Sequence, residues 1–130
     1  MDWIWIAVAA VVVLYLWQRR RGMASGDEVA ELQGRGATVL DVRSPGEYAG
    51  GHVEGAVNVP LDQVEARVAR LVPGQDSPVL LYCRSGTRSG AARRKLQRLG
   101  YTCVHNVGSL SRARRLLSAG AASPSANHQH

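Results

Sequence analysis

The sequence predicts an α/β domain with a parallel sheet covered by helices on both faces, because short apolar runs alternate with segments of helical periodicity. The four apolar runs, which are the expected strands, lie at 37–42, 56–59, 79–83 and 102–107. The run 79–83 is apolar without alternation, which is typical of a strand buried on both faces. A chain of 130 residues has room for one such domain.

Helices are expected between these strands. The first follows a linker at 22–26 and begins at a capping box, with Ser25 as the cap and Glu28 three residues later. It ends near Gln33, before two glycines. Apolar residues at three- and four-residue steps predict helices at 61–71 and 88–99, and a last helix is expected at 109–118. The tail at 119–130 is small and polar, and we expect it to be disordered.

The first twenty-two residues differ from the rest. Residues 3–17 carry no charge, aromatic side chains stand near both ends of this run, and arginines follow at 19–21. This pattern predicts a single transmembrane anchor in a plasma or inner membrane, with the N-terminus outside and the following domain cytoplasmic. Fifteen residues rise about 22 Å as a helix, which is short for a hydrocarbon core of about 30 Å. A signal peptide and a buried core helix are the competing interpretations. The predicted organisation is an anchor at 1–22, a domain at 23–118 and the tail at 119–130.

Composition excludes several classes of function. The net charge of +6 is spread along the chain, without the basic stripe and reading element that nucleic-acid binding requires, so we expect no nucleic-acid partner. The two cysteines form neither a disulfide scaffold nor part of a Cys/His cluster, so we expect no metal. The glycine-rich nucleotide-binding motifs are absent from the sequence.

The chemistry is concentrated at LLYCRSGTRS, residues 80–89. Cys83 ends an expected strand, and a helix begins a few residues later, so free backbone N–H groups converge beside the thiol. The small residues Ser85, Gly86 and Thr87 allow the loop to curl into an anion-binding nest. Arg84 and Arg88 add positive charge and paired donors for an oxyanion. These features favour the Cys83 thiolate, or a sulfur anion attached to it, as a nucleophile.

Two stretches resemble one known family, the single-domain rhodaneses, which are sulfurtransferases. DVRSPGEYAGGHVEGAVNVPL, residues 41–61, resembles the N-terminal signature of the family, and CRSGTRS, residues 83–89, resembles the active-site loop of members that use thiosulfate. The resemblance covers roughly 27–117 and implies a mostly parallel sheet of four to five strands. It departs near the C-terminus, where Ala113 stands in place of a family tryptophan.

The resemblance implies a double-displacement reaction without a cofactor. Cys83 would take the outer sulfur of thiosulfate as a persulfide, release sulfite, and pass the sulfur to cyanide, a small thiol or a protein thiol. The residues expected to bind the substrate are Arg84, Ser85, Gly86, Thr87, Arg88 and Arg43.

Two alternatives to this reaction follow from the same loop. A membrane-tethered persulfide carrier or binding module would show the same residues without turnover of its own. Phosphatases and arsenate reductases related to this family use a C-x5-R loop, whereas Cys83 and Arg88 make the tighter C-x4-R. The tighter loop favours a single sulfur atom over a phosphoryl group.

The remaining residues near the motifs could have either a structural or a functional role. Arg43 either pairs with Glu47 or helps to form the pocket, or it belongs to an ion pair that fixes the turn. His52 is expected to be structural, and Asn58 to bond backbone near the site. Cys103 is a core residue, or a resolving thiol if its strand places it beside Cys83.

Overall fold

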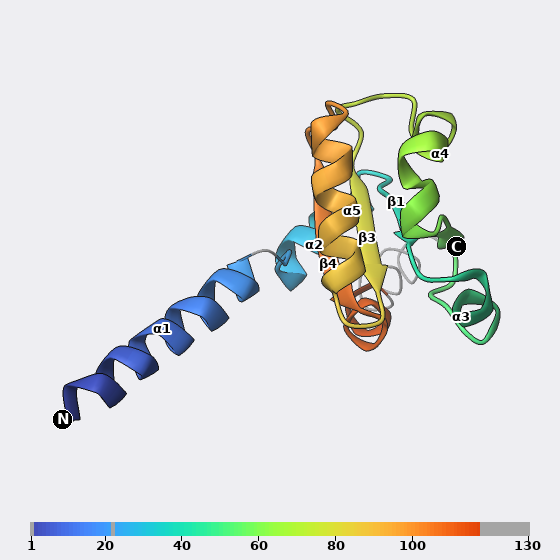
Figure 1. Ribbon diagram of the computed structural model, residues 1–130. Coiled ribbons are helices and arrows are strands. Elements are labelled where there is room, and N and C mark those ends of the chain that lie inside the picture. Colours follow the sequence, from blue (N-terminus) through green and yellow to red (C-terminus); the bar gives the residue numbers. More distant parts are fainter. Residues whose placement is uncertain (1, 22, 118–130) are drawn as a thin grey trace.

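A computed structural model describes residues 2–21 and 23–117, with side chains up to residue 17 in the first range. Its centre is a four-stranded sheet in the order β2-β1-β3-β4, in which every neighbouring pair is parallel (Figure 1). The strands are β1 (Thr38–Asp41), β2 (Val57–Asn58), β3 (Val79–Cys83) and β4 (Val104–Ser109). The predicted α/β class and parallel sheet are confirmed.

Helices cover both faces of the sheet, as expected. On one face α4 (Val64–Leu71) and α5 (Thr87–Arg98) bury apolar side chains against Leu81 and Cys83 of β3. On the other face α2 (Gly26–Gly34) and the helical residues 110–117 pack against Leu80 and Tyr82. Successive residues of a strand point to opposite faces, so β3 contributes to both cores and is buried along its whole length.

Several boundaries differ from those predicted. β4 begins at Val104 and runs to Ser109, two residues later than the expected 102–107. An irregularity in the pairing after Leu81 places Tyr82 opposite Gly108, whose φ of 107° lets the strand continue past the irregularity. The expected helix 61–71 is a 3-10 turn, η1 (Leu61–Gln63), followed by α4.

The turn between β1 and β2 contains a short helix, α3 (Pro45–Ala49). Ser44 caps it and accepts a hydrogen bond from the Glu47 N–H, while the Glu47 carboxylate accepts the Ser44 N–H in return. Proline at the first helical position fixes a helical φ at no cost in hydrogen bonds. These local signals explain why DVRSPGEYAGG leaves the sheet as a compact turn.

The N-terminal helix α1 (Asp2–Arg21) extends away from the sheet, with its apolar side chains exposed (Figure 1). None of the helices in the described part of the chain combines the length and the hydropathy that a membrane crossing requires. The predicted transmembrane segment is therefore not confirmed. Its apolar run of 15 residues spans about 22 Å as a helix, less than the roughly 30 Å of a hydrocarbon core.

The expected linker is partly fixed to the sheet. Met23 forms an isolated parallel bridge with Asn106 of β4, and the Ala24 N–H donates to the Asn106 carbonyl at 2.9 Å. The Arg112 guanidinium donates to the carbonyls of Ala24 and Val107, each at 2.6 Å. Ala113 is fully buried, so the helix that carries it packs closely without the family tryptophan. The tail expected to be disordered, 119–130, lies outside the described residues.

Candidate active site

Cys83 is the last residue of β3, and the loop 84–86 turns directly into α5. Gly86 caps α5 with a φ of 95°, and its N–H donates to the Cys83 Sγ at 3.0 Å. A Cβ at this position would lie 3.3 Å from the Gly108 Cα and would also face a strained backbone. Glycine therefore lets the loop curl tightly over the sulfur, as the sequence predicts.

The surroundings of Cys83 favour its thiolate. Burial of the side chain, which is 0 % exposed, would by itself raise the pKa of the thiol. Hydrogen bonds from the Ser89 hydroxyl and from the backbone N–H groups of Ser89, Ser85 and Gly86 outweigh the burial, so the pKa of Cys83 is lowered from its ordinary value. A lowered pKa places more of the sulfur in its nucleophilic form at neutral pH.

Ser89 and Asn106 complete this site and were not singled out from the sequence. The buried Ser89 Oγ lies 3.4 Å from the Cys83 Sγ and 2.7 Å from the Asn106 Oδ1. The Asn106 amide also donates to the Gly86 carbonyl at 3.0 Å, so it holds the loop glycine. The spacing of Ser89 in the sequence could have indicated its burial. Ser89 stands three residues before Ala92 and seven before Leu96, which places a polar side chain on the apolar face of α5.

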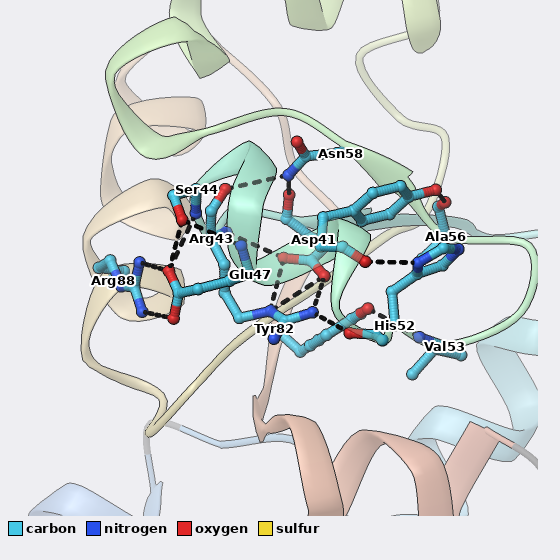
Figure 2. Close-up of polar contacts among 12 residues, drawn as sticks. Asp41, Arg43, Ser44, Glu47, His52, Val53, Ala56, Asn58, Tyr82 and Arg88 are labelled. Carbon is cyan, nitrogen blue, oxygen red and sulfur yellow. Dashed lines mark hydrogen bonds and ion pairs between the residues drawn. The ribbon is translucent and has the colours of Figure 1, made fainter.

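The two arginines of the loop lie in different environments. Arg84 is exposed and forms no ion pair within the residues that the structure describes. Arg88 is half-buried and donates through Nη1 and Nη2 to both carboxylate oxygens of Glu47 (Figure 2). The hydrogen bond to Glu47 raises the pKa of Arg88, and the same bond lowers the pKa of Glu47 to about 2. Of the two, Arg84 is the guanidinium with donors available to an incoming anion.

Ser85 and Thr87 lie in the exposed part of the loop. The Ser85 hydroxyl donates to the Thr87 Oγ1 at 3.3 Å. Their small side chains leave the backbone free to form the turn that the sequence predicts, and their roles in substrate binding stay predictions.

Arg43 lies in the turn that follows β1 and is buried. Its Nε and Nη2 donate to the Asp41 carboxylate (Figure 2). Nη2 also donates to the Gly51 carbonyl at 2.7 Å. The expected pairing of Arg43 with Glu47 is wrong, because Glu47 is bound to Arg88 instead. The arrangement matches the alternative of an ion pair that fixes the turn, and a role of Arg43 in binding substrate stays a prediction.

His52 and Asn58 support the same turn. The His52 ring stacks on Tyr48 at a centroid distance of 3.6 Å, and its Nδ1 lies 2.9 Å from the Tyr48 carbonyl oxygen. The Asn58 amide donates to the carbonyls of Asp41 and Arg43 at 3.0 and 2.9 Å (Figure 2). The expectation that Asn58 bonds backbone near the site is confirmed.

Cys103 directly precedes β4 and is placed away from Cys83, although β3 and β4 are neighbours. The Cys103 carbonyl accepts the N–H of Val79 at the start of β3, whereas Cys83 ends β3 opposite Ser109. Four residues of strand separate the two levels, roughly 13 Å at about 3.3 Å per residue. The interpretation of Cys103 as a resolving thiol within one chain is therefore wrong.

A cleft opens beside the start of α5. It has a volume of about 470 Å³ and is lined by apolar and charged side chains from the turn after β1, from η1 and from α5, among them Val42, Leu61, Arg88 and Lys95. Val42 belongs to the same hydrophobic cluster as Cys83, and the partly buried Leu61 packs against that cluster. The cleft therefore lies on the face of the sheet to which the thiol belongs. Within the described part of the chain, no group of three or more His, Cys, Asp or Glu side chains could hold a metal ion.

A buried cysteine between the carboxyl end of a parallel strand and the start of a helix, with a thiol pKa below its ordinary value, is typical of α/β domains that carry out thiol-dependent transfer. The chain is a member of the rhodanese family: the model of the family described as Rhodanese-like domain matches residues 25–112. The likeness expected from the two motifs is confirmed.

Relatives and solved structures agree with this assignment. The chain is 45% identical over 71 residues to the thiosulfate sulfurtransferase PspE of Escherichia coli, covering 55% of this chain and 68% of that protein. It is similar to a solved rhodanese with anions from E. coli, with a TM-score of 0.57 and 42% identity over 58% of this chain and 89% of the other. The human single-domain sulfurtransferase TSTD1 has a TM-score of 0.57 at 27% identity, over 75% and 96% of the two chains. This membership supports sulfurtransferase activity.

Proposed function

We propose that the protein transfers sulfane sulfur from thiosulfate, or a related donor, to a thiophilic acceptor through a persulfide on Cys83. The observation that carries the proposal is the set of donors around one buried sulfur: the N–H of Gly86 at 3.0 Å and the hydroxyl of Ser89 at 3.4 Å. Such a setting stabilises a sulfur anion. The naming of a close relative as a thiosulfate sulfurtransferase supports thiosulfate as the donor.

The first half of the reaction forms the persulfide. The Cys83 thiolate attacks the outer sulfur of thiosulfate, a bond forms between the two sulfurs, and the sulfur–sulfur bond of the donor breaks. Sulfite leaves with the electron pair of that bond. The exposed Arg84 binds the sulfonate end of the donor, and its charge stabilises the departing sulfite. Because Cys83 is fully buried, the residues around it must shift to admit the donor.

The second half returns the enzyme to its starting state. A cyanide ion or a thiolate attacks the outer sulfur of the persulfide, and the bond between that sulfur and the Cys83 Sγ breaks. The electron pair stays on Sγ, which becomes a thiolate again, and the products are thiocyanate or a new persulfide. We propose that the acceptor, including a protein thiol, approaches through the cleft beside Arg88. The chain's own residues suffice for both halves, so the proposal needs no metal or organic cofactor.

Intact mass tests the proposal. The full-length chain is mixed with thiosulfate and then with cyanide, beside a Cys83→Ala variant and a Cys103→Ser variant. We expect the wild type and Cys103→Ser to gain one sulfur atom and to release it as thiocyanate, while Cys83→Ala does neither. Gain of sulfur without turnover would favour the carrier or binding module. No gain with thiosulfate or with a small persulfide donor would contradict transfer through Cys83.

We also propose that α1 attaches the domain to a membrane on its cytoplasmic side. The proposal is supported by the exposed apolar side chains of residues 3–17 and by the arginines at 19–21 that follow them in the sequence. The test uses an exposed thiol, Glu54→Cys, in a chain in which both Cys83 and Cys103 are replaced by serine, so that this thiol alone can be labelled. We expect this protein in the membrane fraction, and we expect a membrane-impermeant thiol reagent to label it only after the cells are opened. Labelling in intact cells, or recovery away from membranes, would contradict the proposal.

A further inference from the structure

Ser89 is placed between two acceptors but has one hydroxyl hydrogen. Its Oγ lies 2.7 Å from the Asn106 Oδ1 and 3.4 Å from the Cys83 Sγ, and the residue is fully buried. A serine hydroxyl donates one hydrogen bond at a time. The two contacts therefore describe two alternative directions of the same O–H bond.

We propose that Ser89 is a catalytic residue that donates its hydroxyl hydrogen to Asn106 while Cys83 is a protonated thiol, and to the Cys83 sulfur when Cys83 is a thiolate. The assignment rests on the proposed function, in which Cys83 is the nucleophile. In the thiol state the Cys83 S–H donates to the Ser89 oxygen. In the thiolate state that proton has left for solvent, and rotation of the Ser89 O–H supplies the missing donor.

Asn106 makes the rotation possible. Its Oδ1 also accepts the N–H of Gly108 at 2.9 Å, so this buried oxygen keeps a partner when Ser89 turns away. Its amide nitrogen donates to the Gly86 carbonyl at 3.0 Å, which keeps the loop N–H groups in place. Asn106 is therefore a positioning residue, since it acts on the sulfur through Ser89 and Gly86.

The other charged groups around Cys83 are fixed or distant. Arg88 is bound to Glu47, and Arg84 is exposed at the surface of the loop. The end of β1 contributes the Asp41 carboxylate, which is bound by Arg43, and the same guanidinium also donates to the Gly51 carbonyl. From α4 and α5, apolar side chains pack in the cluster that contains Cys83: Val64, Val68, Ala92 and Leu96. Among these neighbours Ser89 is the side chain within hydrogen-bond distance of the sulfur.

The same hydroxyl serves the second half of the reaction. When the acceptor takes the outer sulfur, negative charge develops on the Cys83 Sγ, 3.4 Å from the Ser89 Oγ. A donor aimed at the charge of a leaving group lowers the barrier to its departure. Ser89 therefore assists both formation of the nucleophile and release of the sulfur.

Titration of Cys83 in the full-length chain tests the proposal without any sulfur donor. In a Cys103→Ser background Cys83 is the remaining thiol, and its ionisation is followed by ultraviolet absorbance and by the rate of alkylation with iodoacetamide. We expect Ser89→Ala to raise the thiol pKa by about one unit and to slow alkylation near neutral pH about tenfold. The matched control is Ser77→Ala, in an exposed loop, which we expect to titrate as the parent does.

A double-mutant cycle separates the hydroxyl from general disturbance of the site. Asn106→Ala removes both the competing acceptor and the amide that holds Gly86, so the cycle is read from the coupling between the two positions. We expect the shift that Asn106→Ala causes in the Cys83 pKa to differ between the two backgrounds, with the thiolate favoured more where Ser89 is present. Ser89→Thr, which keeps a hydroxyl, is expected to titrate closer to the parent than Ser89→Ala. Circular dichroism establishes which variants are folded.

An unchanged titration of folded Ser89→Ala, or additive shifts at 89 and 106, would overturn the assignment. If Ser89→Ala does not fold, Ser89→Gly, which also lacks the hydroxyl, is titrated in its place, and an unchanged pKa of Cys83 in that variant would overturn the assignment. A parent chain that titrates as expected but takes no sulfur from any donor would overturn the proposed sulfur transfer and leave the role of Ser89 in ionisation standing.

Discussion

Arg88 and Glu47 form a two-point ion pair that joins the first turn of α5 to α3: Nη1 lies 2.7 Å from Oε1, and Nη2 lies 3.0 Å from Oε2. The same carboxylate accepts the N–H and the hydroxyl of Ser44, which cap α3. One side chain thus fixes a turn of the first motif to the loop of the second.

This ion pair predicts a pH-dependent contribution to stability. The folded state lowers the pKa of Glu47 from 4.5 to about 2, so its stabilisation is complete above pH 4.5 and is lost as the pH falls toward 2. Glu47→Gln is therefore expected to lower the free energy of unfolding at neutral pH, with a difference that shrinks steadily in acid. Urea unfolding at a series of pH values measures this difference. Glu54→Gln, at an exposed position, is the control, and a difference independent of pH would contradict the prediction.

Arg84 is expected to determine affinity for the anionic donor. It is exposed and has no ion-pair partner in the described residues, so removing its charge leaves no buried group unpaired. We expect Arg84→Ala to raise KM for thiosulfate about tenfold with little loss of stability, and Arg84→Lys to restore part of the affinity. Steady-state kinetics with thiosulfate and cyanide measure both. Arg35→Ala, another exposed arginine, should leave KM unchanged, and an equal rise there would indicate an effect of net charge alone.

Gly86 is expected to tolerate no side chain. Alanine at its φ of 95° is strained, and the new Cβ meets the Gly108 backbone at 3.3 Å. We expect Gly86→Ala to cost about 1–3 kcal/mol of stability and to slow persulfide formation, since the N–H that binds the sulfur shifts with the backbone. Thermal unfolding and mass spectrometry measure the two effects. Gly46→Ala, where the position is open and φ is not positive, is the comparison, and equal effects at the two sites would refute this account.

Cys103 is expected to be dispensable for sulfur transfer. It lies at the opposite end of the sheet from Cys83, too far for a disulfide or for passage of sulfur within one chain. Cys103→Ser should take up and release sulfur at the wild-type rate. An intramolecular disulfide between the two cysteines, detected by mass after oxidation of dilute protein, would show that this placement is wrong.

Much of the fold could be predicted from local patterns. The capping box at Ser25, the buried run 79–83 and the apolar face containing Val64 and Val68 each correspond to an element of the structure. The end of β4 could not be predicted in this way. It depends on an irregular register with β3 near Gly108, and pairing between strands distant in sequence leaves no local pattern.

The site likewise contains residues that could be predicted from the sequence and residues that could not. Cys83 and its loop are contiguous, and their chemistry follows from their order along the chain. The partners of Arg43 and Arg88 were not determined by the sequence, because two arginines and two carboxylates allow more than one pairing and packing selects among them. Ser89 and Asn106 meet only through tertiary structure, so neither residue is informative alone.

The bridge between Met23 and Asn106 has a consequence for association between molecules. β4 is an outer strand, and an exposed strand edge is a template for pairing with a second chain. Met23 and Ala24 occupy part of that edge, and Arg112 fastens them there through the Ala24 carbonyl. A chain shortened to begin after Ala24 would expose this edge of β4. We expect such a chain to aggregate through the exposed edge while its sheet is still folded.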